Sequence, residues 1–145
     1  MLFAFSFGTG VTPAQPPSQS PVDSKIVTAA QVNGTWRTKH SEFKLWALGG
    51  QKIKVEFSGV YEYKTVGGPM ANTGEGWGIA HIEGDTATFK PEVSEPECEI
   101  TMKFTSGRLK VSQVGICGFG HNVTAEGDYR RVSRSRPKFR KELTD

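Results

Sequence analysis

Apolar and polar residues alternate along most of the chain with a period of two, which is typical of half-buried β-strands. The clearest segment is 97–105, where every second residue is apolar and the residues between are Glu, Lys or Thr. Ser106-Gly107 predicts a tight turn, because glycine accepts the positive φ that such turns need. A two-residue turn places Phe104 opposite Leu109, so apolar residues pair with apolar residues and the sequence predicts a β-hairpin.

Other segments show the same alternation between glycine-containing turns. The predicted strands cover 43–48, 52–64, 75–81, 86–90 and 124–132. Residues 52–64 form one long strand kinked at Gly59 in this interpretation. Two segments rich in glycine, proline and polar residues, 67–74 and 91–97, are expected to be loops, and the first is a candidate gate for the barrel.

The number of strands is about eight, at which an antiparallel sheet can close on itself. The predicted fold class is therefore all-β: an up-and-down meander in a closed or nearly closed barrel, with one short helix over 25–31 capped by Asp23-Ser24. The predicted organisation is listed in chain order: 1–14, a segment like a signal peptide; 15–24, a linker rich in Pro and Ser; 25–133, a single barrel domain; and 134–145, a basic tail.

The chain has two cysteines, and the hairpin register places Cys98 opposite Gly115 rather than Cys117. A diagonal pair is about 7–8 Å apart, beyond the roughly 4.4–6.8 Å Cα reach of a disulfide. The apolar parity slips after Val111, which predicts a bulge or bend between Gln113 and Gly115 that brings Cys117 to Cys98. The alternative is two buried thiols in a reducing compartment.

The N-terminal segment favours the disulfide. Residues 2–11 are apolar, too short to span a bilayer, and similar to the hydrophobic core of a secretory signal with a weak cleavage site before Gln15. A basic region before this core is missing, and a disordered apolar leader is the alternative. A secretory signal implies a secreted or periplasmic protein, where disulfides persist.

Gly34-Thr35-Trp36, on the first strand after a short helical lead-in, resembles the G-x-W signature of the calycins, the lipocalins and avidins. In that family the tryptophan closes one end of the barrel and packs against an arginine of the last strand. The resemblance implies that Arg130, or alternatively Arg131, takes this place. A guanidinium over an indole contributes about 0.5–2 kcal/mol.

The second half, with the pattern C-x-I-x-M-x-F…C-G-F-G-x-N-V…G-x-Y-x-R, resembles uncharacterised bacterial secreted β-domains. Some small periplasmic barrels of this general kind are lysozyme inhibitors, and the resemblance makes inhibition a candidate function. No inhibitor signature loop is recognisable in the sequence.

Charge is concentrated at the C-terminus. Residues 130–145 hold seven Lys and Arg and two acidic residues, a net +5 within a chain total of +3, so the remainder carries −2. We favour a solvated, mobile tail over a weak contact with anionic envelope surfaces. Phe139 is the only aromatic residue of the tail, so no specific binding of nucleic acid is expected.

The sequence shows no catalytic, metal or cofactor motif, so we expect neither an enzyme nor a cofactor. His40, His81 and His121 lack metal-ligand spacing, and the carboxylates between Glu92 and Glu99 are typical of a solvated loop rather than of an acid–base pair or a calcium site. An enzyme would require an unrecognised site around His81, His121 or these carboxylates.

Glycines at 74, 76 and 78 remove the side chains from one face of a strand, which predicts a close neighbour there. We expect Tyr61 or Tyr63 to fill this space. The alternative is a binding surface made by Trp77 and Trp46.

Two non-catalytic functions therefore stay open. The first is binding of a small apolar ligand by Trp36, Tyr61, Tyr63, Trp77 and Arg130. The alternative is a protein-interaction or inhibitor module that contacts an extracytoplasmic protein. It would act through the Cys98–Cys117 hairpin and the adjacent loop, where Phe119 and His121 lie.

Overall fold

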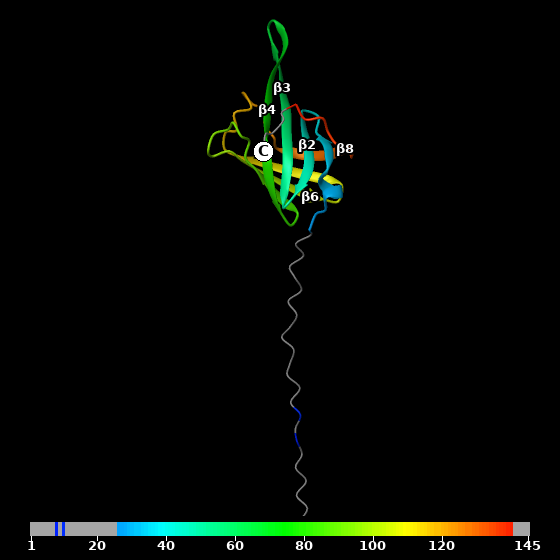
Figure 1. Ribbon diagram of the computed structural model, residues 1–145. Coiled ribbons are helices and arrows are strands. Elements are labelled where there is room, and N and C mark those ends of the chain that lie inside the picture. The colour runs from blue at the N-terminus through cyan, green and yellow to red at the C-terminus, as the bar shows by residue number, and fades with distance from the viewer. Residues whose placement is uncertain (1–7, 9, 11–25, 141–145) are drawn as a thin grey trace, which may run out of the picture.

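The computed structural model describes residues 8, 10 and 26–140, and the predicted signal segment and linker lie largely outside this part. One short helix and eight antiparallel strands follow in chain order: α1 (Ala29–Val32), β1 (Gly34–Arg37), β2 (Ser41–Gly49), β3 (Lys52–Thr65), β4 (Gly68–Glu83), β5 (Thr86–Phe89), β6 (Glu99–Thr105), β7 (Arg108–Val114) and β8 (Gly127–Ser133). Each strand pairs with the next, and β8 pairs with β1, so the sheet closes into a barrel (Figure 1). The predicted fold class is confirmed.

The predicted hairpin register is also confirmed. Phe104 lies opposite Leu109 and Met102 opposite Val111 in the β6–β7 ladder. Residues 52–65 form one continuous strand, as the alternation predicted. The alternation itself specifies this register, because a slip by one residue would expose every inward apolar side chain.

One predicted loop is wrong, and the predicted short helix is present with a later start. Residues 68–74, expected in a loop, belong to β4, a strand of 16 residues that pairs with β3 from Gly68 to His81. Glycine and proline weaken a strand locally, but β3 supplies a partner along the whole length. The helix begins at Ala29 rather than residue 25. Gln31 Oε1 accepts a hydrogen bond of 2.9 Å from the Thr28 amide at its start. In the described part of the chain, no helix combines the length and apolar character needed to cross a bilayer.

Aromatic side chains fill the barrel interior. Phe43 lies 5.0 Å from both Phe57 and Tyr129, and Phe57 lies 4.6 Å from Phe119, measured between ring centroids. Apolar residues of β2, β3 and β5–β7 surround this column and are buried: Leu45, Ile53, Val55, Phe89, Ile100, Met102 and Leu109. The Tyr129 hydroxyl is satisfied by Ser41 Oγ and the Ala125 carbonyl, each at 2.7 Å. Burial raises the pKa of this phenol above its ordinary value.

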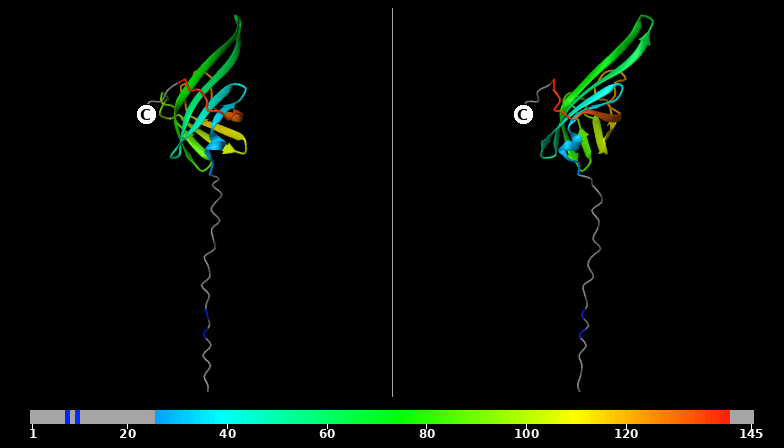
Figure 2. Two further views of the ribbon diagram at one scale, coloured as in Figure 1. Left: turned by 45° about the vertical axis from the view of Figure 1, so that its right-hand side comes forward. Right: turned by 90° about the vertical axis from the view of Figure 1, so that its right-hand side faces the viewer.

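The barrel has two different ends. The helix end carries α1 and the turns after β2, β4 and β6, and the Val27 amide donates to the Gly84 carbonyl there at 3.2 Å. The hairpin end carries the turn after β1, the loops after β5 and β7, and the long β3–β4 hairpin. This hairpin projects far beyond the other strands in every view (Figure 2).

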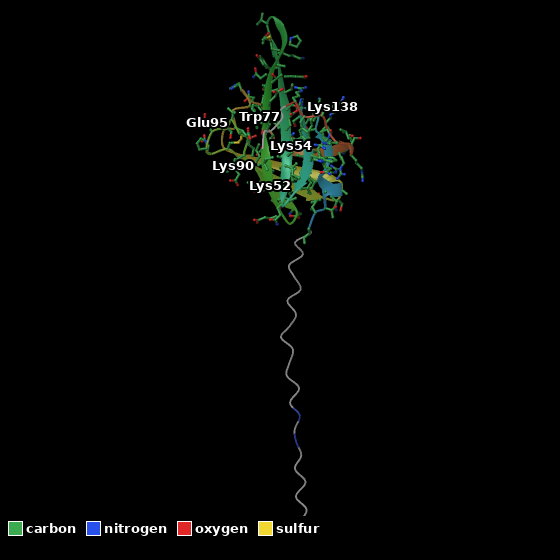
Figure 3. All side chains as sticks on the ribbon, viewed as in Figure 1. Lys52, Lys54, Trp77, Lys90, Glu95 and Lys138 are labelled. Atoms are coloured by element: carbon green, nitrogen blue, oxygen red, sulfur yellow. A yellow bond between two sulfur atoms is a disulfide. The ribbon has the colours of Figure 1, made fainter. Side chains whose placement is uncertain are left out.

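Residues 134–140 lie against the outside of the barrel, which differs from the preferred expectation of a freely solvated tail. Arg136 lies over the Trp46 ring at 5.4 Å, and Lys54 lies over the Phe139 ring at 4.6 Å. The Arg140 amide donates to Glu56 at 2.8 Å. The segment therefore crosses β2 and β3 on the wall that faces the viewer in Figure 3, where Lys54 and Lys138 are labelled. Residues 141–145 lie outside the described part.

Candidate interaction site

The projecting hairpin, residues 60–73, extends beyond the strands that flank it. β2 pairs with β3 only as far as Gly59, and β5 pairs with β4 only from His81 onward. Up to Gly59, β3 is held on both sides by β2 and β4, whereas residues 61–72 are held in the described ladder only by each other. This arrangement carries side chains away from the barrel, where a partner can reach them.

One face of the projecting hairpin is aromatic. Tyr61 and Tyr63 are stacked, with ring centroids 6.2 Å apart and planes inclined by 22°. Met70 is directly opposite Tyr63 in the register and is 53% exposed. Val66, in the turn at the tip, is fully exposed. Tyr61, Tyr63 and Met70 lie on the face of β3 and β4 that points inward within the barrel, and Val66 lies at the tip of the hairpin. All four side chains lie beyond the end of the buried core.

The edges of the projecting hairpin are unsuited to strand addition. The Val60 amide donates to the His40 carbonyl at 2.8 Å, on the side of β3 that faces away from β4. Because peptide groups alternate in an antiparallel ladder, those of Glu62 and Lys64 also point to this outer edge of the hairpin. On the opposite edge, Pro69 has no amide to donate. Charged residues and proline blunt an exposed edge against pairing. The aromatic face, rather than either edge, is therefore the part suited to recognition.

The base of the projecting hairpin is fixed to the loop between β7 and β8. Asn72 Nδ2 donates to the His121 carbonyl at 2.9 Å. Beside it, a cleft of about 440 Å³ lies between the hairpin, the turn after β1 and the start of β8. The structure thus stacks two of the predicted site residues, Tyr61 and Tyr63, and joins the loop of His121 to the base of the same hairpin.

Phe119 has a different place from the one expected for an interaction residue. It is 3% exposed and points into the barrel, onto Phe57. A Cβ atom at Gly74 would lie 1.8 Å from the Phe119 carbonyl oxygen, and one at Gly76 would lie 2.6 Å from its ring. The glycine stripe does receive an aromatic residue, as predicted, but the residue is Phe119 and not Tyr61 or Tyr63.

The disulfide fixes the loop that carries Phe119. Cys98 and Cys117 are bonded, with a Cα–Cα distance of 4.9 Å. The β6–β7 ladder ends at Glu99 and Val114, and the predicted continuation of this register would place Cys98 opposite Gly115. The chain turns there because Gly115 has φ of +78°, and a Cβ on it would lie 2.4 Å from the Glu97 carbonyl oxygen. Cys117 reaches Cys98 through this bend, and Phe119 follows two residues later.

At the helix end, Trp36 pairs with Arg131 rather than with Arg130. The Arg131 guanidinium lies 4.7 Å from the Trp36 ring, donates to the Ala30 carbonyl at 2.7 Å, and also donates to the carbonyl of Gln31. Arg131 lies on the same face of β8 as the buried Tyr129 and is opposite Trp36 in the register, whereas Arg130 is exposed on the outer wall. Burial, and to a lesser extent the charge of Arg134, lower the pKa of Arg131.

The remaining predicted residues are scattered. Trp36 closes the end opposite the projecting hairpin, and Trp77 lies on the outer wall with its indole nitrogen 3.2 Å from Glu92 (Figure 3). His81 is exposed, on the outer face of β4. Within the described residues, no three His, Cys, Asp or Glu side chains are close enough to share a metal ion.

Sequence reasoning missed Val66 and Met70 because both fell at the border of, or within, the expected loop 67–74. The signal that would have placed them is the matched length of the two segments around Val66-Gly67. The residues before and after that dipeptide pair with each other in one continuous β3–β4 ladder, whose far end is the pair Lys52 and His81.

Comparison with protein-family models, with curated proteins and with solved structures gave no significant match. The chain has the closed, eight-stranded antiparallel architecture that calycins share, and its Trp36–Arg131 contact joins the first and last strands.

Proposed function

We propose that this protein is a non-catalytic interaction module of the extracytoplasmic space that binds a partner protein through its projecting hairpin. The observation that carries the proposal is the aromatic face of the projecting hairpin, where Tyr61 and Met70 are exposed and Tyr63 is half-buried, raised beyond a barrel whose interior is already filled. Tyrosine supplies a large, rigid and amphipathic contact area, and it is enriched among residues that dominate binding energy.

The filled interior shifts the balance between the two functions inferred from the sequence. Lipocalin-like binding requires a hollow barrel, whereas here Phe43, Phe57 and Tyr129 occupy the axis. The Cys98–Cys117 disulfide, buried and well formed, supports an extracytoplasmic location. A calycin relationship and an inhibitory role like that of small periplasmic barrels belong to this proposal, and lysozymes are the first defined partners to test.

A test uses inhibition of a panel of lysozymes by the intact protein and by a Tyr61→Ser/Tyr63→Ser variant. Both tyrosines lie outside the core, so the variant is expected to fold. Loss of a central tyrosine contact typically costs about 2 kcal/mol or more, so we expect inhibition to weaken by at least roughly tenfold. A matched variant, Thr86→Ser/Thr88→Ser in β5, should inhibit as the unmodified protein does.

If no lysozyme is inhibited, site-specific photo-crosslinking decides between an interaction module and other functions. A photoreactive p-benzoylphenylalanine replaces Tyr63, or Thr88 as the control position, in cells that secrete the protein. An adduct of one defined mass at position 63 that disappears with Tyr61→Ser supports the proposal. Equal labelling at both positions, or none at either, contradicts it.

A small apolar ligand remains the second candidate, at a different place from the one expected. A cleft of about 330 Å³ at the helix end lies between α1 and the turns after β2 and β4. Its apolar lining includes Val27, Val32, Ile53 and Ile82, and its size is near the lower limit for small-molecule sites, about 300 Å³. An extra mass seen only under native conditions, and lost in an Ile82→Asp variant, would favour this function.

A further inference from the structure

We infer that the wall of the barrel formed by β1 and β6–β8 is a docking surface for an anionic phospholipid bilayer. This inference goes beyond the projecting hairpin and does not depend on it. The surface, called the basic wall below, consists of five exposed cations from four strands: Arg37, Lys103, Arg108, Lys110 and Arg130.

The observation behind the inference is that the strand register pairs like charges. Arg130 of β8 is opposite Arg37 of β1 on one side and opposite Arg108 of β7 on the other. The three guanidinium groups therefore start from one row across three adjacent strands. In the next row, Lys110 is opposite Lys103 of β6. Like charges directly opposite each other destabilise a sheet.

The chain uses complementary pairs elsewhere, so the like pairs are not a general property of this barrel. Lys44 is opposite Glu56 on the wall formed by β2 and β3, with Nζ and Oε1 3.3 Å apart. The acidic groups that face the basic wall are few: Asp128 is opposite Lys110, and Glu42 holds Arg37 at 2.5 Å. Arg108 and Arg130 face no acidic residue in the register.

Repulsion between like charges on adjacent strands is relieved when an anionic partner binds them. The chemistry that offsets clustered arginines and lysines is phosphate, and cations at an anionic membrane surface each contribute about a factor of five in affinity. Val132, which follows Arg131 and is half exposed, adds an apolar contact beside the cations.

A nucleic acid is the less favoured occupant. Proteins that bind single strands track the backbone in a groove and stack bases on aromatic side chains. The outward residues of β6–β8 include no aromatic residue: Glu99, Thr101, Lys103 and Thr105 on β6; Arg108, Lys110, Ser112 and Val114 on β7; Asp128, Arg130 and Val132 on β8.

The basic wall is also distinct from the cationic C-terminal segment. In the right-hand view of Figure 2 that segment and the strands β6 and β7 lie on opposite sides of the barrel. Two of the segment's charges are already engaged, since Arg136 lies over Trp46 and the Arg140 guanidinium contacts Glu75. One variant set can therefore separate the wall from the tail.

The test is flotation of the full chain with vesicles rich in phosphatidylglycerol and with vesicles of phosphatidylcholine alone. The wall variant is Arg108→Gln/Lys110→Gln/Arg130→Gln. The control variant, Lys52→Gln/Lys64→Gln/Lys138→Gln, removes the same charge from other exposed sites, including the tail. We expect binding only to the anionic vesicles, a loss of roughly 100-fold in the wall variant, and a far smaller loss in the control.

A second readout needs no lipid. If the like pairs repel one another, the wall variant should melt at a higher temperature than the unmodified protein at low salt, and this gain should shrink near about 0.15 M salt as screening sets in. Failure of the unmodified protein to bind anionic vesicles, or an equal loss in the control variant, overturns the inference. Tighter binding to single-stranded DNA than to vesicles, lost in the wall variant, overturns it in favour of a nucleic acid. A Tyr61→Ser/Tyr63→Ser variant should retain vesicle binding, which separates this inference from the hairpin proposal.

Discussion

The helix end and the hairpin end of the barrel are both closed, but by different means. At the helix end the closing residues are near one another in the sequence: Trp36 Nε1 donates to the Val32 carbonyl at 2.9 Å, four residues earlier. Arg131 then joins the last strand to this unit through the Trp36 ring and the carbonyls of α1. At the hairpin end the closing residue is Phe119, which arrives from a long loop.

The hairpin end depends on three features that are far apart in the chain. Phe119 packs on Phe57, its backbone and ring occupy space left by Gly74 and Gly76, and the Cys98–Cys117 bond anchors the loop. The helix end thus relies on a local hydrogen bond of Trp36 and on cation–π and hydrogen-bond contacts of Arg131 from the last strand. The hairpin end relies on the Cys98–Cys117 bond and on the glycines at 74 and 76, whose lack of side chains leaves room for Phe119.

This difference indicates why the functional surface proposed above lies at the hairpin end. A closure tied by a disulfide leaves β3 and β4 free to extend past the core without opening it. The following predictions test the separation of the two ends, in order of decreasing effect.

Trp36→Ala should have the largest effect. Removal of a fully buried tryptophan typically costs about 3–5 kcal/mol, and here it also removes the ring on which Arg131 lies. We expect the free energy of unfolding in urea to fall by about 4 kcal/mol. Trp46→Ala, on the outer wall, should cost less than half of this amount. Equal losses would show that Trp36 has no special role at the helix end.

Removal of the disulfide, as Cys98→Ala/Cys117→Ala, should lower stability by about 3 kcal/mol, the chain-entropy value for a loop of this size. The sequence separation of the two cysteines is 19. Hydrogen exchange should accelerate first in the loop around Phe119, and reduction of the unmodified protein should reproduce the pattern. Acceleration of similar size at α1 would contradict the independence of the two ends.

Much of this architecture was predictable because it follows from local patterns. The strand periods, the β6–β7 register and the bend at Gly115 all arise from alternation and turn chemistry. The contact of an arginine with Trp36 followed from the resemblance to calycins. That resemblance left Arg130 and Arg131 open, and strand parity decides between them, because Arg131 lies on the same face of β8 as the buried Tyr129.

The unpredicted part is non-local. The expected loop 67–74 became a strand because β3 offered a partner, and composition alone does not report a partner's length. Phe119 filled the glycine stripe because the disulfide carried it there. The outer-wall position of residues 134–140 depends on Trp46 and on Glu56, which lie far from this segment in the sequence.

Gly74→Ala tests the closure of the hairpin end without touching Phe119 or the cysteines. The added Cβ would lie 1.8 Å from the Phe119 carbonyl oxygen, a backbone atom that cannot move without its loop. Overpacking of this kind costs about 1–3 kcal/mol, and we expect about 2 kcal/mol by urea unfolding. Gly67→Ala is the matched control. Its Cβ would meet no atom closer than Thr65 Oγ1 at 3.8 Å, so a change within about 0.5 kcal/mol is expected. An equal fall in the free energy of unfolding at both positions would show that close packing of Phe119 against Gly74 is not the cause.

Arg131→Gln compared with Arg130→Gln gives the sharpest contrast, because the two residues are neighbours with the same charge. Arg131 caps two carbonyls of α1 and lies over Trp36, whereas Arg130 faces Arg37 and Arg108. Charge-assisted hydrogen bonds contribute about 1.5–3 kcal/mol, so Arg131→Gln should lower stability by about 2 kcal/mol and shift the tryptophan fluorescence of Trp36. Arg130→Gln should leave stability unchanged or raise it slightly at low salt, since it removes two like-charge pairs. A loss at position 130 as large as that at 131 would mean that the closure of the helix end extends to the outer wall.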